Sequence, residues 1–128
     1  MGDQPVVAVV DDDESVRVAL ASLLRSVGFA VLLFSSAEDL FNGRNLRSIG
    51  CLILDWRMPG MDGLQLQSGL IANGWRIPTI FLTADRSEEG RAQALREGAI
   101  AFLNKPVNAD VLLAAVQSGL ARREQCST

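Results

Sequence analysis

Residues 6–24 read VVAVVDDDESVRVALASLL, and this stretch decides the fold class of the chain. Its first part, Val6–Val10, is an unbroken run of β-branched and small apolar residues, which is typical of a strand buried on both faces of a parallel sheet. The run stops at Asp11, and from Val16 onward apolar residues recur at helical spacing until Gly28, a residue that favours a helix end. The stretch therefore predicts one strand followed by one helix, with acidic side chains at the turn between them.

The same order of strand and helix returns along the rest of the chain. Four more apolar runs predict strands at residues 30–34, 51–54, 77–82 and 100–103, and helical patterns follow them at about 36–42, 64–72, 87–97 and 108–120. This alternation predicts an α/β fold, in which a single five-stranded parallel sheet carries helices on both of its faces.

The chain has 128 residues, which is enough for one domain, and it shows no internal repeat, low-complexity stretch or linker. We assign residues 6–121 to that domain, residues 1–5 to a polar N-terminal tail, and residues 122–128 to a C-terminal tail or the start of a linker. Apolar residues make up 48% of the chain, so we expect a globular domain with a well-filled core rather than disorder.

The charge balance and the missing residue types exclude several functions. With 12 basic and 15 acidic side chains, the chain is a poor direct binder of nucleic acid, because phosphate contacts need clustered Lys and Arg. The chain has no His, which removes His-based acid–base catalysis, His-ligated zinc and a phospho-His relay within the chain. Lys105 is the only Lys, since the other 11 basic residues are Arg.

The cysteines and the apolar runs bear on the location of the protein. Cys51 and Cys126 show no metal or redox spacing, and two free thiols in a reducing cytosol is the simplest interpretation. No basic signal segment opens the chain, and no apolar run approaches the roughly 20 residues of a membrane span. We therefore expect a cytoplasmic protein that does not contact a membrane.

Polar side chains stand where four of the five predicted strands end. The residues at these ends are Asp11 and Asp12, then Asp55, then Thr83 with Ala84, and finally Lys105 with Pro106. In open α/β sheets, ligands bind outside the carboxyl ends of the strands, at the point where the strand order reverses. We therefore expect three carboxylates, a hydroxyl group and the only Lys to converge on one edge of the sheet.

Charge indicates the chemistry of such a site. Three carboxylates that lie close together cannot all ionise without a counter-charge, and a divalent cation supplies one. With oxygen donors only, magnesium is the cation that this site would bind, and the metal can also bridge a phosphoryl group. The carboxylate of an Asp can act as a nucleophile, so the site is equipped to accept a phosphoryl group.

These residues carry a resemblance to a known family. The motifs VVDDDESVR (9–17), LDWRMPGMDG (54–63), FLTA (81–84) and FLNKP (102–106) together resemble a receiver domain of two-component response regulators, also called a CheY-like domain. The sequences SSAED (35–39) and DWRMP (55–59) are most similar to those of the FixJ-like receivers. Such receivers usually precede a helix-turn-helix DNA-binding domain. The resemblance covers the chain from about residue 6 to 120 and implies a flavodoxin-like, doubly wound sheet with strand order 2-1-3-4-5.

The resemblance also implies a role for each residue at the predicted strand ends. Asp55 would be the phosphoacceptor, and Mg²⁺ would be held by Asp11, Asp12, the Asp55 carboxylate and the backbone carbonyl of Arg57. Thr83 and Ala84 would bind the phosphoryl group and Lys105 would form an ion pair with it. Phe102 matches the switch aromatic of the family, and the Lys105–Pro106 peptide bond would be cis.

What the family does implies a regulatory function rather than metabolic catalysis. A sensor histidine kinase would donate the phosphoryl group to Asp55, and the domain would lose it slowly to water as a weak autophosphatase. Phosphorylation would then change the surface of the fourth helix, fifth strand and fifth helix, and favour a homodimer or the release of a tethered domain. We expect the output to be control of transcription through a DNA-binding domain beyond residue 128, with a free-standing receiver as the alternative.

Two other classes of function remain open at this point. A small phosphatase or phosphotransferase would also use an Asp nucleophile and Mg²⁺, but its usual Asp-x-Asp pattern is absent at Asp55, where Trp56 and Arg57 follow. A degenerate receiver could serve only as a protein-binding module, but such domains typically lose an acid, the Thr or the Lys, and this chain keeps them all.

Several residues beside the site allow two interpretations. Asp13 and Glu14 are best read as acids at a helix N-terminus, without a role in chemistry. Phe102 is either the switch residue or part of the core. Arg57 and Asp85 either pair across the mouth of the pocket, where they would tune access, or are independent solvated side chains. Trp56, next to Asp55, would report Mg²⁺ binding or phosphorylation through its fluorescence.

Overall fold

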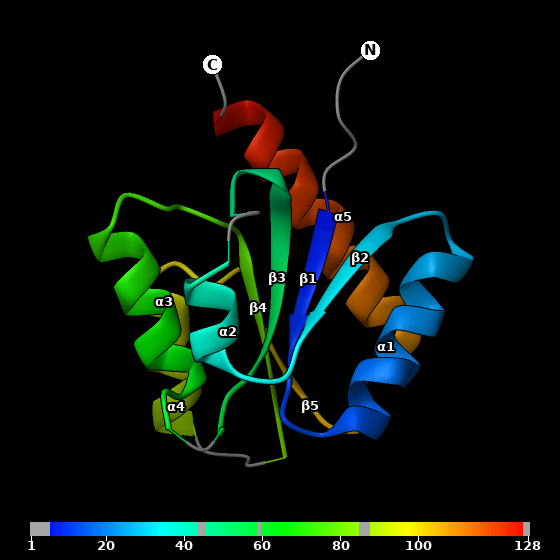
Figure 1. Cartoon of the computed structure of the whole chain (residues 1–128), viewed down its shortest axis with the longest axis horizontal. Helices are drawn as coiled ribbons and strands as arrows, with labels where there is room; N and C mark the ends of the chain where they lie inside the picture. Colours follow the sequence, from blue (N-terminus) through cyan, green and yellow to red (C-terminus); the bar gives the residue numbers. More distant parts are fainter. Residues whose placement is uncertain (1–5, 44–45, 59, 85–87, 127–128) are drawn as a thin grey trace.

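The computed structural model describes residues 6–43, 46–58, 60–84 and 88–126, without the side chains of 88–89 and 122–126. Its sheet has five parallel strands in the order β2-β1-β3-β4-β5, as the sequence predicts (Figure 1). The strands are β1 (Val6–Val10), β2 (Ala30–Phe34), β3 (Ile49–Asp55), β4 (Thr79–Thr83) and β5 (Ala101–Asn104).

The described helices cover both faces of the sheet. They are α1 (Glu14–Ser26), α2 (Ala37–Phe41), α3 (Gly63–Ala72), α4 (Glu88–Arg96) and α5 (Ala109–Cys126), with a short 3-10 turn η1 (Leu46–Ser48) before β3. Helices α1 and α5 pack on one face, while α2, α3 and α4 pack on the other (Figure 1). Every residue of β3 is buried, because this central strand has helices on both sides.

Strand boundaries differ from the predicted ones in a way that affects the site. Strand β4 begins at Thr79 rather than at residue 77; Pro78 has no N–H group for the ladder, although its carbonyl accepts from the N–H of Leu52 at 2.8 Å. At the other end, Asp55 and Thr83 are the last residues of β3 and β4 rather than residues that follow them. Their backbones are therefore held by the sheet, which fixes where their side chains start.

The C-terminal helix is longer than expected. We predicted a helix end near Leu120 and a polar tail from residue 122, but α5 continues to Cys126. Arg, Glu and Gln after residue 121 are good helix formers, and no Gly or Pro follows Gly119 to stop the helix. The turn η1 was not predicted, and Ser87, the expected cap of α4, lies outside the described residues.

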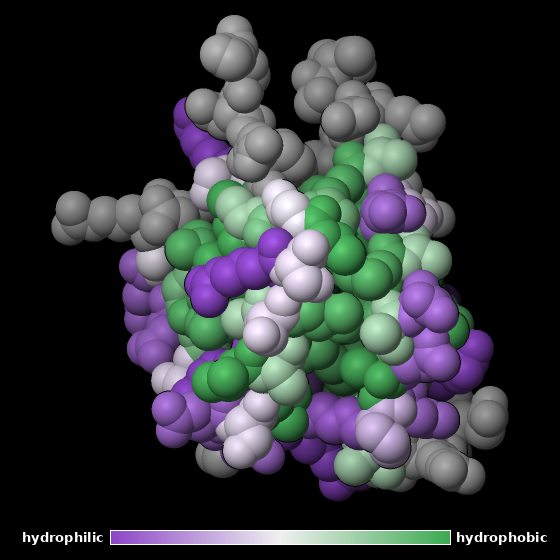
Figure 2. Space-filling model, turned by 90° about the vertical axis from the view of Figure 1, so that its right-hand side faces the viewer, coloured by the Kyte–Doolittle hydropathy of each residue, from purple (hydrophilic) through white to green (hydrophobic). Residues whose placement is uncertain are grey.

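Some apolar side chains on and beside α1 are exposed. Figure 2 views the molecule from the right of Figure 1, where α1 lies, and apolar side chains occupy the middle of that face. Val18, Val27 and Leu33 are exposed apolar residues of α1, the loop after it and β2.

None of the helices within the described residues has the length and apolar composition of a membrane span.

Gly63, the first residue of α3, lets the helix start directly against the end of β3. A Cβ atom at this position would lie 2.6 Å from the backbone oxygen of Asp55 and 2.9 Å from the Phe81 ring. The Gly63 N–H donates to the carbonyl of Trp56 at 3.3 Å, which closes the intervening loop. The short loop between β3 and α3 therefore depends on a residue without a side chain at its end.

Gly63→Ala should destabilise the domain by about 1–3 kcal/mol, because the backbone oxygen that the new methyl group meets cannot move aside. Gly69→Ala in the same helix is the matched control, since its Cβ would meet only the edge of the Phe41 ring, at 3.0 Å. Alanine is also the better helix former there, by about 1 kcal/mol, which offsets part of the contact. Urea unfolding measures both variants, and a loss at Gly69→Ala as large as that at Gly63→Ala would contradict this account.

Candidate functional site

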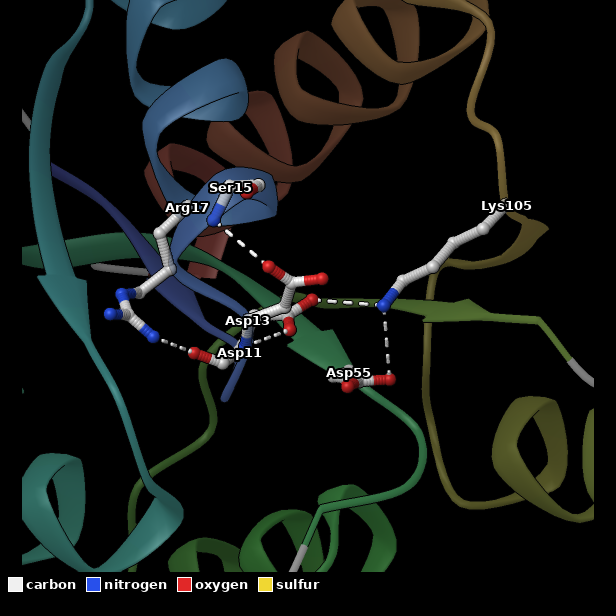
Figure 3. A network of polar contacts seen from close by, with 6 residues as sticks. All are labelled: Asp11, Asp13, Ser15, Arg17, Asp55 and Lys105. Carbon is white, nitrogen blue, oxygen red and sulfur yellow. Dashed lines mark hydrogen bonds and ion pairs between the residues drawn. The ribbon is translucent and has the colours of Figure 1, made fainter.

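The carboxyl ends of the strands bring together three of the side chains that the sequence predicts at one site, namely Asp11, Asp55 and Lys105 (Figure 3). Asp11 follows β1, Asp55 ends β3, and Lys105 follows β5. The Lys105 ammonium lies 3.0 Å from Asp11 Oδ2 and 3.4 Å from Asp55 Oδ1, so it bridges two carboxylates that are 44 residues apart in sequence. The Lys105–Pro106 peptide bond after it is cis, as the family resemblance implies.

Asp11 is the most constrained acid of the site. Only 1% of its surface is exposed, and its second oxygen, Oδ1, accepts the N–H of Asp13 at 2.9 Å. The guanidinium of Arg17 donates to the backbone carbonyl of Asp11 at 2.6 Å (Figure 3). We did not predict a role for Arg17. Its position shortly after the acidic run, in the first turns of α1, indicates that it lies near the site.

Asp13 has the structural role that we expected for it. It is the N-cap of α1, and its side chain accepts the N–H of Ser15 at 2.9 Å. A carboxylate at this place satisfies a free helix N–H group and interacts favourably with the helix dipole. Glu14 is an acid in the first turn of the same helix.

Burial and charge shift the ionisation of the groups that meet here. Desolvation and the neighbouring charge of Asp11 raise the pKa of Asp55 to about 6, although the charge of Lys105 and hydrogen bonds from Lys105 and the Arg57 backbone act in the opposite direction. Burial alone would lower the pKa of Lys105, but its hydrogen bond to Asp11 and the charges of both acids outweigh this, so its pKa lies above the ordinary 10.5. Asp11, Asp12 and Asp55 together carry more negative charge than Lys105 compensates.

The acids also form a group that suits a metal ion. Asp11, Asp12 and Asp55 each offer a carboxylate oxygen, and these oxygens lie within 4.8 Å of one another. Asp11 is fully buried, Asp55 is 8% exposed and Asp12 is open to solvent. Oxygen donors with surplus negative charge, partly open to water, are the donor set that Mg²⁺ prefers.

A pocket of about 400 Å³ opens beside Asp55. It is lined by Asp55, Arg57, Thr83, Ala84 and Lys105. Thr83 is buried and ends β4, whereas Ala84 is exposed. The pocket is therefore polar on the side of Asp55 and Lys105 and accessible from outside.

Phe102 lies away from this pocket, in the core. It is 6% exposed, and its ring centroid lies 5.1 Å from that of Trp56 and 6.1 Å from that of Phe81. The Trp56 ring also meets Phe81 edge-on at 5.1 Å. The residue next to Asp55 in sequence is thus in direct contact with the expected switch aromatic, a contact that the sequence did not indicate.

Two further expectations concern Asp85 and the two cysteines. Asp85, the proposed partner of Arg57, lies outside the described residues, so their pairing stays a prediction. Cys51 is a free cysteine, and burial raises the pKa of its thiol to about 12, which makes it unreactive. The side chain of Cys126 is not among those described.

The raised pKa of Asp55 gives its carboxyl a pH-dependent effect on stability. An acid whose pKa is about 6 when folded and 3.8 otherwise stabilises the fold below about pH 4 and loses that effect as the pH rises through about 6. We compare Asp55→Asn with the parent chain in magnesium-free buffer. The unfolding free energy of the variant minus that of the parent chain should rise by up to about 3 kcal/mol from about pH 4 to pH 8. Urea unfolding at both pH values measures this gain, and a difference that does not change with pH would contradict it.

Comparison with known proteins agrees with this geometry. The sequence matches the response regulator receiver domain over residues 7–117. It is 43% identical to the response regulator protein TmoT of Ectopseudomonas mendocina, over 94% of this chain and 55% of TmoT. It is 35% identical to the transcriptional regulatory protein FixJ of Bradyrhizobium diazoefficiens, over 91% of this chain and 57% of FixJ.

A solved structure of a response regulator is also similar to this chain. The response regulator StyR superposes with a TM-score of 0.90 at 44% identity, over 95% of this chain and 62% of StyR. The chain spans about half the length of the curated relatives that it matches. On its sequence, its strand order and the acids gathered at its carboxyl edge, the chain belongs to the response regulator receiver domain family.

Proposed function

We propose that this receiver domain accepts a phosphoryl group on Asp55 from the phospho-His of a sensor histidine kinase. The observation that supports this most strongly is that Asp55 lies 3.4 Å from Lys105 and lines the same pocket as Lys105, Thr83 and Ala84. Residues 1–128 contain no His, so the phospho-His donor lies outside them. Asp55 is the nucleophile because it alone of the acids Asp11, Asp12 and Asp55 lines that pocket.

The chemistry is a transfer between two nucleophiles. A carboxylate oxygen of Asp55 attacks phosphorus in line, the P–N bond to the donor imidazole breaks, and the imidazole leaves with the bonding electron pair. Loss of the group reverses the outcome: water attacks phosphorus, the carboxylate of Asp55 is regenerated and inorganic phosphate departs. This slow hydrolysis would limit the lifetime of the signal, which suits a regulator and not a metabolic enzyme.

Magnesium is the cofactor that these residues fit. Asp11, Asp12 and Asp55 would hold it through their carboxylates, together with the backbone carbonyl of Arg57. When bound, Mg²⁺ supplies positive charge for the equatorial oxygens of the phosphoryl group. The chain itself supplies the rest: Lys105 pairs with a phosphoryl oxygen, and the Thr83 hydroxyl and the Ala84 N–H donate to the others.

The conformational response starts from these donors. A shift of Thr83 toward a phosphorylated Asp55 would change the space beside β5, where Phe102 lies. Because Phe102 already points inward against Trp56 and Phe81, phosphorylation in our proposal stabilises an arrangement that the chain can reach without it. That is a shift of population between two states, and Phe102 contributes through packing because it has no hydroxyl group.

The output in our proposal is a change of assembly. The outer surfaces of α4, β5 and α5 would form a homodimer on phosphorylation, and the exposed apolar side chains of Leu95 on α4 and Val111 on α5 support this. The full protein would be a cytoplasmic transcription regulator, since curated relatives such as FixJ carry that name and are about twice as long. A phosphatase acting on small substrates lacks a comparable supporting observation.

The phosphoacceptor assignment predicts a specific loss of labelling. Incubated with Mg²⁺ and a small phosphodonor such as phosphoramidate, the parent chain should gain one phosphoryl group that hydroxylamine removes, as expected for an acyl phosphate. Asp55→Asn should gain none, and Asp110→Asn, which changes an exposed acid at the start of α5, should label like the parent chain. Intact-mass spectrometry measures the gain, and labelling that survives Asp55→Asn would refute the assignment.

A further inference from the structure

The loop that joins β3 to α3 is held at both ends by its own backbone and caps. At its start, the N–H of Trp56 donates to the Leu82 carbonyl at 2.8 Å, and Met58 is buried. At its end, Asp62 and Gln65 form a capping box, in which each side chain accepts the backbone N–H of the other at 2.8–2.9 Å. Between these ends lie Gly60 and Met61, which belong to no helix or strand.

The middle of the loop is held by a side chain from another element. Glu38, in the first turn of α2, accepts the backbone N–H of Met61 at 3.2 Å through Oε2. The same oxygen lies 2.7 Å from where a Cβ atom of Gly60 would stand, and Gly60 has a φ of +77°. The backbone angle favours glycine there, and a Cβ atom at this position would push the Glu38 carboxylate aside.

Helix α2 is anchored well enough to hold that carboxylate in place. Its Ala37 and Leu40 are fully buried, and Ser36 caps it by accepting the N–H of Asp39 at 3.1 Å. Phe41, at its other end, lies against α3, where a Cβ at Gly69 would be 3.0 Å from the ring. This five-residue helix thus contacts both the loop and the helix that follows it.

We propose that Glu38 is a positioning residue for the site, which acts on the loop that carries the Arg57 carbonyl. The inference rests on the proposed function, in which that carbonyl is a magnesium ligand. Glu38 touches neither a carboxylate of the site nor its lysine, and no other residue of α2 belongs to the site. Its hydrogen bond holds Met61, four residues after Arg57, and in our proposal this keeps the carbonyl where Asp11 and Asp55 can share a cation with it.

The effect should appear in metal binding rather than in folding. Glu38 is exposed, and the net contribution of a hydrogen bond at such a place to stability is small. Residues that orient a metal ligand without touching the metal typically change metal affinity by about 10-fold or more. Since Glu38 acts through several intervening backbone bonds, we expect a smaller change, of about 5-fold.

Three substitutions separate the hydrogen bond from the charge of Glu38. Glu38→Gln removes the charge but keeps an oxygen that can accept from Met61, whereas Glu38→Asp keeps the charge on a side chain that is one methylene too short. Glu38→Ala removes both. Asp39→Asn is the matched control, because it removes a charge from the next residue, whose side chain meets Ser35 and not the loop.

The test uses Mg²⁺ alone as the ligand, with affinity measured by isothermal titration calorimetry, and hydrogen exchange of the Met61 amide measured by NMR. We expect Glu38→Ala and Glu38→Asp to bind Mg²⁺ about 5-fold more weakly and to exchange the Met61 amide faster, while Glu38→Gln and Asp39→Asn stay within about 2-fold of the parent chain. Melting temperatures should be nearly equal in all of them.

Two results would overturn the inference. Unchanged exchange at Met61 in Glu38→Ala would show that the hydrogen bond does not hold the loop. The second result is a Mg²⁺ affinity that falls equally in the three variants that lose a charge, Glu38→Gln, Glu38→Ala and Asp39→Asn. If Glu38→Asp then bound Mg²⁺ like the parent chain, only the charge of Glu38 would matter. Neither readout needs phosphoryl transfer, so a failure of the phosphoacceptor assignment at Asp55 would be seen separately, in the labelling of Asp55→Asn.

Discussion

The ammonium group of Lys105, shared between Asp11 at 3.0 Å and Asp55 at 3.4 Å, is the interaction on which the site depends. The acids that follow β1 and end β3 repel each other, and the cation that follows β5 contacts both and offsets that repulsion. The compensation is incomplete, since burial and Asp11 still raise the pKa of Asp55 to about 6 and Asp12 adds a third carboxylate nearby. Incomplete compensation makes the site receptive to a divalent cation and leaves Asp55 as a nucleophile within reach of the pocket.

The packing around the site places the reactive groups and connects them to the rest of the fold. Asp55 ends a fully buried strand, and α3 begins directly against its carbonyl because Gly63 has no side chain. Trp56 turns the other way, into contact with Phe81 and Phe102. Asp55 and Trp56, adjacent in the sequence, therefore join the pocket to the aromatic rings of Phe81 on β4 and Phe102 on β5.

The sequence predicts the sheet and the site well, because both depend on local patterns. Apolar runs such as Val6–Val10 mark buried strands, and the rule that ligands bind at carboxyl ends then selects Asp11, Asp55, Thr83 and Lys105 without knowledge of the distances between them. Strand and helix ends are less predictable, since the start of β4 at Thr79 depends on Pro78, and α5 runs on to Cys126 where composition suggested a tail. The contact between Glu38 and Met61 joins residues 23 apart on different elements, and no pattern in the sequence indicates it.

The central claim is that the acids at the strand ends form a site for Mg²⁺. Binding of Mg²⁺ by two singly substituted chains tests this claim most directly. Asp12→Asn removes an exposed carboxylate of the proposed metal group, while Asp13→Asn removes the same charge one residue away and leaves a side chain that still caps α1. We expect one Mg²⁺ per chain by isothermal titration calorimetry. The Mg²⁺ affinity should be lowered about 10-fold or more in Asp12→Asn and be nearly unchanged in Asp13→Asn. Equal affinities in the two variants would contradict it, because the acids at the strand ends would then act only as diffuse negative charge.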